Sequence, residues 1–177
     1  AIDHLVSLGR RRIGYLGYNY PNAVDATRFR GYRIGLERAG IPFDPALVFR
    51  GVSSFHGGYD AMAAFHATGV QIDGLFASND MMGIGAMRFS LTNGIDVPGK
   101  LAIVGFGGSE VASMVTPDLT TVSMPLYLIG KTAVQELLQL LNGTSEQHRQ
   151  LNIEPEILVR GSSVASMDSR DLQAPSR

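Results

Sequence analysis

The sequence predicts an α/β fold, an open and doubly wound parallel sheet between two helical layers, which makes a three-layer sandwich. Short apolar and β-branched runs alternate along the chain with amphipathic segments of helical spacing. Strand–helix–strand repetition with short loops favours parallel pairing through right-handed crossovers. The run Leu101–Phe106 is almost entirely apolar, as expected for a strand that helices cover on both faces.

The individual elements follow from the residue pattern in chain order. Ile2, Leu5 and Val6 recur at helical spacing, and Gly9 is a natural helix end. Strands are expected over residues 13–17, 47–50, 74–78, 101–106, 119–124 and 157–160. Helices are expected over residues 27–39 and 58–68, from a cap at Asp80 to Leu91, and from Pro125 to Leu141. Residues 162–177 offer little to bury and are expected to be frayed, with 166–177 as a disordered tail.

The composition excludes several functional classes. Hydrophobic residues make up 45% of the 177 residues and charged residues 18%, as in ordinary globular domains. The sequence has no apolar run long enough to span a bilayer, and its first residues lack the order of a signal peptide. Cysteine is absent, which excludes disulfides and thiolate metal sites and favours a reducing cytoplasm. The net charge is −1, and the eight arginines among residues 1–50 are more typical of a solvated surface than of a DNA-binding face.

A binding site is expected at one edge of the sheet. In open parallel sheets, ligands bind at the carboxyl ends of the strands. The loops there are residues 18–28, 51–56, 78–80 and 107–110, and they combine polar with aromatic side chains. Such a lining suits a hydroxylated or carboxylated small molecule. The candidate side chains are Asn19, Tyr20, Asn22, Asp25, Arg28, Ser53, Ser54, Phe55, His56, Asn79, Asp80, Ser109 and Glu110.

The same edge carries little sign of catalysis. Ser53, His56 and Asp80 are the types needed for a triad, but the sequence has no GxSxG elbow. The four histidines lie far apart with no HExxH pattern, and neither glycine-rich segment, 83–85 or 105–108, forms a GxGxxG turn or a phosphate loop. We therefore expect no catalytic residue, no metal and no cofactor.

Several segments together resemble the LacI/GalR family of transcription regulators. They are AIDHLVSLGRRRIGYLG at the start, RFRGY at 28–32, FASNDMMGIGAMRFSLTNGIDVPGKLAIVGF at 76–106, PDLTTVSMPLYLIGKTAV at 117–134 and LVRGSSV at 158–164. Each motif alone is weak, whereas their order and spacing are specific to the family. The resemblance covers about residues 1–165.

The resemblance implies a two-lobed, periplasmic-binding-protein-like core behind a helix-turn-helix head. A cytoplasmic homodimer would bind a sugar or related metabolite between the lobes and would contact DNA only through the head, which this chain lacks. Residues of about 10–124 and 155–165 would form the second lobe, and helices of about 1–9 and 126–142 would belong to the first. We predict that these two helices pack against a neighbouring chain or lie displaced.

The resemblance also assigns residues to the effector site. Arg28 matches the family arginine that grips the effector, and we favour this role over that of a surface arginine at the start of a helix because its loop position and its motif agree. Asn79 matches a frequent effector contact, and its alternative is a purely structural loop residue. Phe76 would line the cleft or belong to the core. Ser53 stands where many members place a stacking aromatic ring, a role that Phe55 could take.

Two further features concern Gly107 and the helix after Asp80. The family typically has an aspartate at the position of Gly107, so the site either admits a bulkier or anionic effector or has weakened. The helix resembles the subunit contact surface of the family, although a methionine-rich stripe is also typical of a core. The contact residues would be Ile84, Met87, Arg88 and Leu91.

Two other functions remain open from the sequence. A periplasmic sugar-binding protein of a transport system shares the implied fold. An enzyme on a Rossmann-like scaffold also shares it, because fold alone does not fix function.

Overall fold

A computed structural model describes residues 1–142 and 150–164 of the chain. Within these residues a six-stranded sheet has the order β2-β1-β3-β4-β5-β6. Strands β1 to β5 are parallel, and β6 is antiparallel to β5. In the register of the sheet, Leu16 of β1 lies opposite Phe49 of β2 and Ala77 of β3. The strands are β1 (Ile13–Tyr18), β2 (Val48–Gly51), β3 (Gly74–Ala77), β4 (Ala102–Gly107), β5 (Thr120–Ser123) and β6 (Glu156–Leu158).

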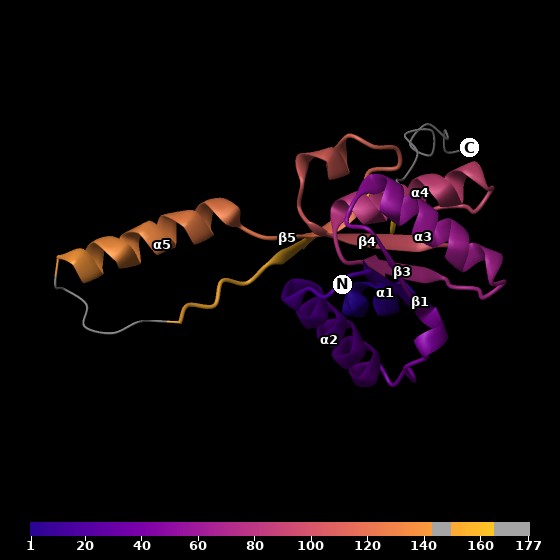
Figure 1. Cartoon of the computed structure of the whole chain (residues 1–177), viewed down its shortest axis with the longest axis horizontal. Coiled ribbons are helices and arrows are strands. Elements are labelled where there is room, and N and C mark those ends of the chain that lie inside the picture. The colour runs from indigo at the N-terminus through magenta and orange to yellow at the C-terminus, as the bar shows by residue number, and fades with distance from the viewer. Residues whose placement is uncertain (143–149, 165–177) are drawn as a thin grey trace, which may run out of the picture.

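Helices cover both faces of this sheet, which confirms the three-layer sandwich. Figure 1 shows α1 and α2 on one face and α3 and α4 on the other. The helices are α1 (Ile2–Ser7), α2 (Ala23–Arg38), α3 (Phe55–Ala67), α4 (Asp80–Thr92) and α5 (Leu126–Leu141), and short 3-10 turns occupy Pro45–Leu47 and Glu110–Ser113. No helix among the described residues is both long and apolar enough to cross a bilayer.

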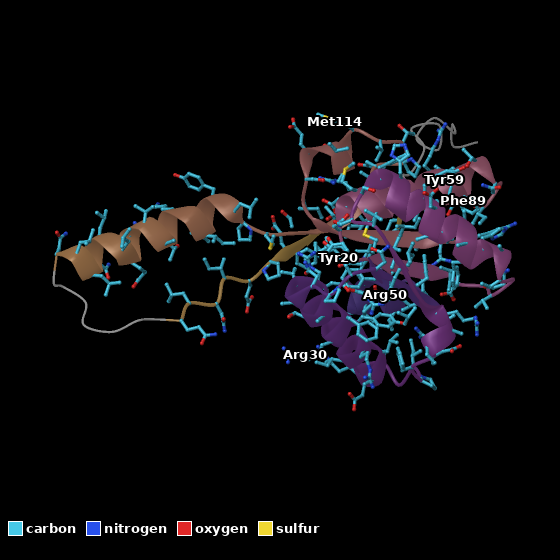
Figure 2. The ribbon with its side chains drawn as sticks, in the orientation of Figure 1. Tyr20, Arg30, Arg50, Tyr59, Phe89 and Met114 are labelled. Carbon is cyan, nitrogen blue, oxygen red and sulfur yellow. The ribbon has the colours of Figure 1, made fainter. Side chains whose placement is uncertain are left out.

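Two apolar clusters hold the layers together. The cluster beneath α1 and α2 includes Leu5, Tyr15 and Tyr32, all with 0% exposure. On the other face, Tyr59 of α3 packs edge-on against Phe89 of α4, with ring centroids 5.4 Å apart (Figure 2). Helices α3 and α4 approach closely because Gly85 faces the Phe55 carbonyl group, where any Cβ atom would collide with the backbone.

Helices α2, α3 and α4 begin at side-chain caps that lie at the carboxyl edge of the sheet. Asn22, Ser54 and Asn79 accept hydrogen bonds from the backbone N–H groups three residues later. Each cap satisfies one of the free N–H groups of a first helical turn. The prediction that Asp80 caps its helix is wrong, because Asn79 does so and the Asp80 carboxylate points elsewhere.

The two outer helices behave differently from each other. Helix α1 packs on the sheet of its own chain, since Ile2 and Leu5 are buried and the His4 ring lies 2.8 Å from the Ser163 hydroxyl group. The prediction that α1 would be displaced is therefore wrong. Helix α5 has no buried residue and extends away from the sheet, as Figure 1 shows, in agreement with the prediction for that helix.

The end of the described chain corrects two further expectations. Strand β6 is antiparallel because the chain leaves β5 at the carboxyl edge, passes through α5 and re-enters from the same edge. Residues 162 and 163 are buried rather than frayed. The Ser162 hydroxyl group donates to the Ile103 carbonyl oxygen and accepts from the Thr120 N–H group, both interactions bridging separate strands. The predicted disordered tail, 166–177, lies outside the described residues.

Alkaline solution is expected to destabilise the fold through its buried tyrosines. The Tyr32 hydroxyl group donates to the Ile13 carbonyl oxygen, and burial, followed by the negative charge of Asp44, raises the pKa of Tyr32 to about 12. An unfolded tyrosine ionises near pH 10, so above that pH the unfolded state loses a proton that the folded state keeps. Between pH 10 and 12 the free energy of unfolding should therefore fall by about 1.4 kcal/mol per pH unit because of Tyr32.

Urea unfolding at a series of pH values measures this loss. Burial also raises the pKa of Tyr15, so the wild-type slope should exceed the contribution of Tyr32 alone. Tyr32→Phe should make the slope shallower, and an unchanged slope in this variant would contradict the assignment.

Candidate functional site

The strand order creates a crevice between the carboxyl ends of β1 and β3. From β1 the chain turns into α2 on one face of the sheet, whereas from β3 it turns into α4 on the other. Neighbouring parallel strands whose connections diverge in this way leave room for a ligand between their loops. The residues at this point are Tyr18 at the end of β1, Ser78 and Asn79 after β3, and Arg28 on α2.

Arg28 lies over this crevice and is held by neutral groups. Its Nη1 atom donates to the Ser78 carbonyl oxygen at 2.6 Å and lies 3.5 Å from the Tyr18 hydroxyl oxygen. Its Cζ atom stands 3.9 Å from the centre of the Phe106 ring, a cation–π contact that fixes the plane of the guanidinium group. These contacts use one nitrogen and one face of the guanidinium group. They fix the orientation of Arg28, which the sequence predicted to bind the ligand.

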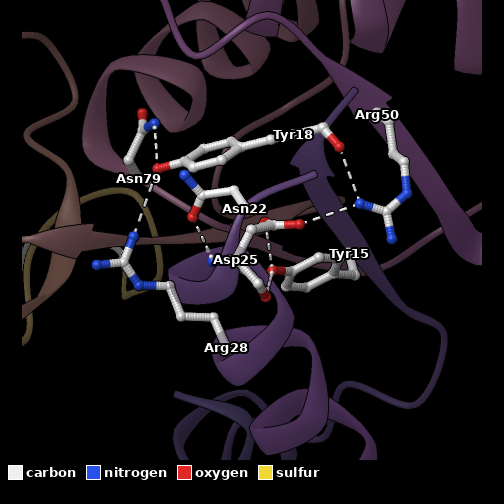
Figure 3. A network of polar contacts seen from close by, with 7 residues as sticks. All are labelled: Tyr15, Tyr18, Asn22, Asp25, Arg28, Arg50 and Asn79. Atoms are coloured by element: carbon white, nitrogen blue, oxygen red, sulfur yellow. Dashed lines mark hydrogen bonds and ion pairs between the residues drawn. The ribbon is translucent and has the colours of Figure 1, made fainter. Parts of the chain in front are cut away.

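Asn79 connects three elements around the same point. Its amide nitrogen donates to the Tyr18 hydroxyl oxygen at 3.1 Å and to the Ser53 hydroxyl oxygen at 2.8 Å, while its amide oxygen caps α4. The structure therefore brings together the predicted residues Arg28, Asn79 and Ser53. We call these three residues and Tyr18 the Arg28–Tyr18 cluster (Figure 3 shows it without Ser53).

Tyr18 was not singled out from the sequence, although it joins the other members of the cluster. Its side chain is 8% exposed, and its hydroxyl oxygen accepts from both Asn79 and Arg28. Burial opposes ionisation, but hydrogen bonds from Asn79 and Ser53 and the charge of Arg28 outweigh burial and lower the pKa of Tyr18. Only its position as the last residue of a strand at the carboxyl edge could have indicated its role.

A second set of hydrogen-bonded residues, Tyr15, Asp25 and Arg50, supports the cluster. Asp25 is 3% exposed, and its carboxylate accepts from the Tyr15 hydroxyl group at 2.8 Å and from Arg50 at 3.0 Å (Figure 3). Arg50 also donates to the Tyr18 carbonyl oxygen at 2.9 Å. These three residues fix the position of the first turn of α2, and therefore the position of the backbone that carries Arg28.

The remaining predicted site residues lie in different surroundings. Phe76 is 5% exposed, packs against Tyr15, and contributes an edge to a hollow of about 350 Å³ that Arg28 and Phe106 also line. Phe55 begins α3, where its ring packs against the α3–α4 cluster and lies edge-on to His56. That hollow lies against α1 and α2 and is not lined by Tyr18, Ser53 or Asn79, so the structure places Phe76 in the core beneath these helices. No described contact brings Phe55 to Arg28.

Asp80 and Gly107 form a tight structural pair beside the crevice. Asp80 is 3% exposed and accepts from the Ser109 N–H and hydroxyl groups, both at 2.8 Å, and from the Thr121 hydroxyl group. Gly107 has φ +140°, and a Cβ atom there would lie 3.2 Å from the Asp80 carboxylate. The backbone conformation at residue 107 favours glycine, and a side chain there would crowd the buried Asp80 carboxylate. The fold itself therefore explains why this position has no side chain.

The triad considered from the sequence does not assemble. The Asp80 carboxylate bonds to Ser109 and Thr121, and the Ser53 hydroxyl group accepts from Asn79. Among the described residues no hydrogen bond joins Ser53, His56 and Asp80. In the same part of the chain, no three potential metal ligands gather at one point.

The predicted contact surface on α4 needs a correction. Ile84 and Met87 are 5% and 2% exposed and belong to the core between α3 and α4. Their side chains are therefore not available to a second subunit. Arg88 and Leu91 are exposed on the same helix and could reach a partner.

Comparison with known proteins places this geometry in a family. The periplasmic binding protein-like domain matches residues 2–163. The HTH-type transcriptional regulator CelR of Thermobifida fusca is 31% identical over 162 residues, which is 92% of this chain and 48% of the regulator. The chain thus spans about half the length of the curated relatives it matches.

Solved structures agree with this placement. A complex of the transcriptional regulator CelR with cellobiose has a TM-score of 0.84 at 31% identity, covering 92% of this chain and 50% of that one. A lac repressor dimer bound to operator and the anti-inducer ONPF has a TM-score of 0.84 at 29% identity, covering 93% and 49%. The chain belongs to the family of periplasmic binding protein-like domains, in the form found in LacI-family transcription regulators.

Proposed function

We propose that this chain is the effector-sensing part of a DNA-binding transcription regulator, a repressor that binds a sugar or related metabolite between two lobes. The observation that supports it most is the Arg28–Tyr18 cluster at the β1/β3 crevice. There a forked cation, a phenol, an amide and a hydroxyl group converge from β1, α2, the β2–α3 loop and the β3–α4 loop. Converging polar groups, with the Phe106 ring against the Arg28 guanidinium group, suit a hydroxylated ligand.

The proposed mechanism requires a second lobe opposite this crevice. Residues of about 10–124 and 155–165 would form the lobe described above, and α1 goes with it because it packs on the same sheet. Helix α5 would belong to the other lobe, since the exposed apolar side chains visible along it in Figure 2 have no cover within the described chain. The effector would shift the angle between the lobes only by its difference in affinity for the two states.

We also propose an assembly and a location by analogy with the relatives. A related lac repressor binds its operator as a dimer, and we propose the same for this regulator, with Arg88 and Leu91 among the contacts. DNA would be bound through a helix-turn-helix head outside this chain, and the protein would act in the cytoplasm without catalysing a reaction. The named relatives are regulators, which does not favour a transport function.

Nuclear magnetic resonance of the labelled chain tests the proposal. We expect neutral or charged sugars at millimolar concentration to shift the amide signals of Tyr18, Ser53, Asn79 and Phe106. Signals at the opposite edge of the sheet, such as Val70 and Gly94, should stay in place. The affinity should be low because one lobe supplies only part of the contacts. Shifts confined to the opposite edge, or none from any sugar, would contradict an effector site here.

A further inference from the structure

The hydroxyl group of Ser78 is buried without a hydrogen-bond partner beside the Arg28–Tyr18 cluster. Ser78 is 0% exposed, and its Oγ atom makes no hydrogen bond within the described chain. An unpaired polar group in a buried position costs free energy, so proteins retain few of them, and each one calls for an explanation. Residues of this chain bury Ser78, so its surroundings do not depend on a second lobe.

The backbone of Ser78 fixes the place of this hydroxyl group. Its N–H group donates to the Leu16 carbonyl oxygen at 2.8 Å, which extends the pairing of β1 and β3 by one residue. Its carbonyl oxygen accepts from Arg28 at 2.6 Å. Because both backbone groups are bonded, the freedom that remains to Ser78 is rotation of its side chain and of its hydroxyl hydrogen.

The Ser78 hydroxyl group lies close enough to two tyrosines to influence both. Tyr15 belongs to the core cluster beneath α1 and α2, and Tyr18 to the cluster beneath α3 and α4. Burial raises the pKa of Tyr15, and the Ser78 hydroxyl group acts against this rise. Burial also opposes ionisation of Tyr18, but the hydrogen bonds and the charge described above lower its pKa, and Ser78 adds to them. One hydroxyl hydrogen therefore has two possible acceptors, one on each face of the sheet.

The two tyrosines differ in how their own hydrogens are used. The Tyr15 hydroxyl group donates to the Asp25 carboxylate at 2.8 Å. The Tyr18 oxygen accepts from Asn79 at 3.1 Å, and within the described chain no group accepts the Tyr18 hydrogen. A ligand oxygen in the crevice can therefore accept it. A phenol that donates its hydrogen becomes a stronger acceptor itself, because successive hydrogen bonds polarise one another.

We propose that Ser78 is a positioning residue of the effector site, whose hydroxyl group donates to Tyr18 when a ligand accepts the Tyr18 hydrogen and turns to Tyr15 when the crevice is empty. This inference rests on the proposed function and adds a residue that acts through Tyr18 without touching the ligand. Ligand binding would thereby reach Tyr15, and through it the pair of Asp25 and Arg50 at the start of α2.

Tyrosine ionisation tests this role in the absence of a ligand. With carbon-13 at the tyrosine Cζ atoms, nuclear magnetic resonance at a series of pH values gives the pKa of each tyrosine. Ser78→Ala should raise the pKa of Tyr18, because the phenolate loses a donor. Ser78→Cys, with a similar size and a weaker donor, should give an intermediate pKa. Ser90→Ala is the matched control, since it removes a buried hydroxyl group that donates to the Ala86 carbonyl oxygen within α4, and it should change neither pKa.

Titration with sugars tests the role of Ser78 in binding. Glucose, galactose, mannose and their 6-phosphates are added to the labelled chain, and the sugar that shifts the Tyr18 signal most is taken further. In the parent chain this sugar should also shift the Tyr15 signal, whereas Tyr59, which packs between α3 and α4, should stay in place. Ser78→Ala should abolish the Tyr15 response and weaken binding about fivefold, as the loss of one hydrogen bond predicts. Its thermal midpoint should not fall, because the group removed is unpaired.

The outcomes separate this inference from the proposed function. If Ser78→Ala keeps the parental pKa of Tyr18 and the parental affinity, the inference is overturned, although sugar binding to the parent still supports an effector site. A raised pKa of Tyr18 with unchanged affinity would also overturn it, because Ser78 would then contact Tyr18 without positioning it for the ligand. If no sugar binds the parent chain, the proposed function fails and the role of Ser78 in it fails as well.

Discussion

Replacing Arg28 with alanine is expected to weaken effector binding by about a hundredfold or more. The guanidinium group offers a ligand two or more charge-assisted hydrogen bonds, and each such bond contributes about 1.5–3 kcal/mol. A loss of about 3 kcal/mol corresponds to roughly a hundredfold in the dissociation constant. Titration calorimetry with the sugar that shifts the amide signals of the crevice most strongly measures this change directly.

The same substitution should cost the fold little. Within the described chain Arg28 donates to one carbonyl oxygen and one phenol and covers one ring, and it forms no ion pair. We expect a loss of about 1 kcal/mol in the free energy of unfolding, within the range of one hydrogen bond and a partly exposed cation–π contact. Arg38→Ala should leave both binding and stability nearly unchanged, since its ion pair with Asp3 is exposed. If Arg28→Ala binds the ligand normally, the effector site lies elsewhere.

The order and type of the elements could be predicted because the apolar periodicity is strong. All six strands were expected within a few residues of their observed bounds, and so were the five helices, with larger errors at two helix starts. Helix α2 begins at Ala23 rather than near Thr27, and α3 at Phe55 rather than Gly58. The caps Asn22 and Ser54 begin these helices about one turn before the residues from which their starts were predicted.

The sequence predicted part of the site. The roles of Tyr18 and Asp80 were not predicted, and for the same reason. Arg28, Asn79 and Ser53 were expected at the carboxyl edge, and the structure brings them within hydrogen-bonding reach of Tyr18 or of each other. Tyr18 itself resembles a core residue at the end of an apolar strand. Its role depends on where α2 and the loops after β2 and β3 meet, and a local pattern does not contain that information.

Asp80 is the clearest case in which the local sequence does not determine the role of a side chain. An aspartate that caps a helix and an aspartate that accepts hydrogen bonds in the core look alike in the sequence. An Asn-Asp pair before an apolar helix provides two side chains of which either one could cap. The structure gives the cap to Asn79 and directs Asp80 across the sheet to Ser109 and Thr121. The choice depends on donors about 30 and 40 residues away in sequence, one in the loop after β4 and one within β5.

Replacing Asp80 with alanine is therefore expected to be strongly destabilising, by about 3–4 kcal/mol in the free energy of unfolding. The change leaves the Ser109 N–H and hydroxyl groups and the Thr121 hydroxyl group without their acceptor in a buried region. Thermal unfolding should show a fall of about 10 °C in the midpoint for a chain of this length.

The matched variant Asp80→Asn separates lost hydrogen bonds from lost volume. Asparagine fills the same space, but its NH₂ group faces donors where an oxygen accepted before, so it should recover only part of the loss. If Asp80→Ala proved as stable as the parent, water or a rearranged loop would have to satisfy all three donors. Because Ser109 follows Gly107 and Gly108 at the crevice, the loss of Asp80 should also loosen the β4 end of the site. Ligand affinity in Asp80→Asn should then fall although Arg28 and Tyr18 are intact, which would show that the buried carboxylate holds this edge of the sheet in its binding geometry.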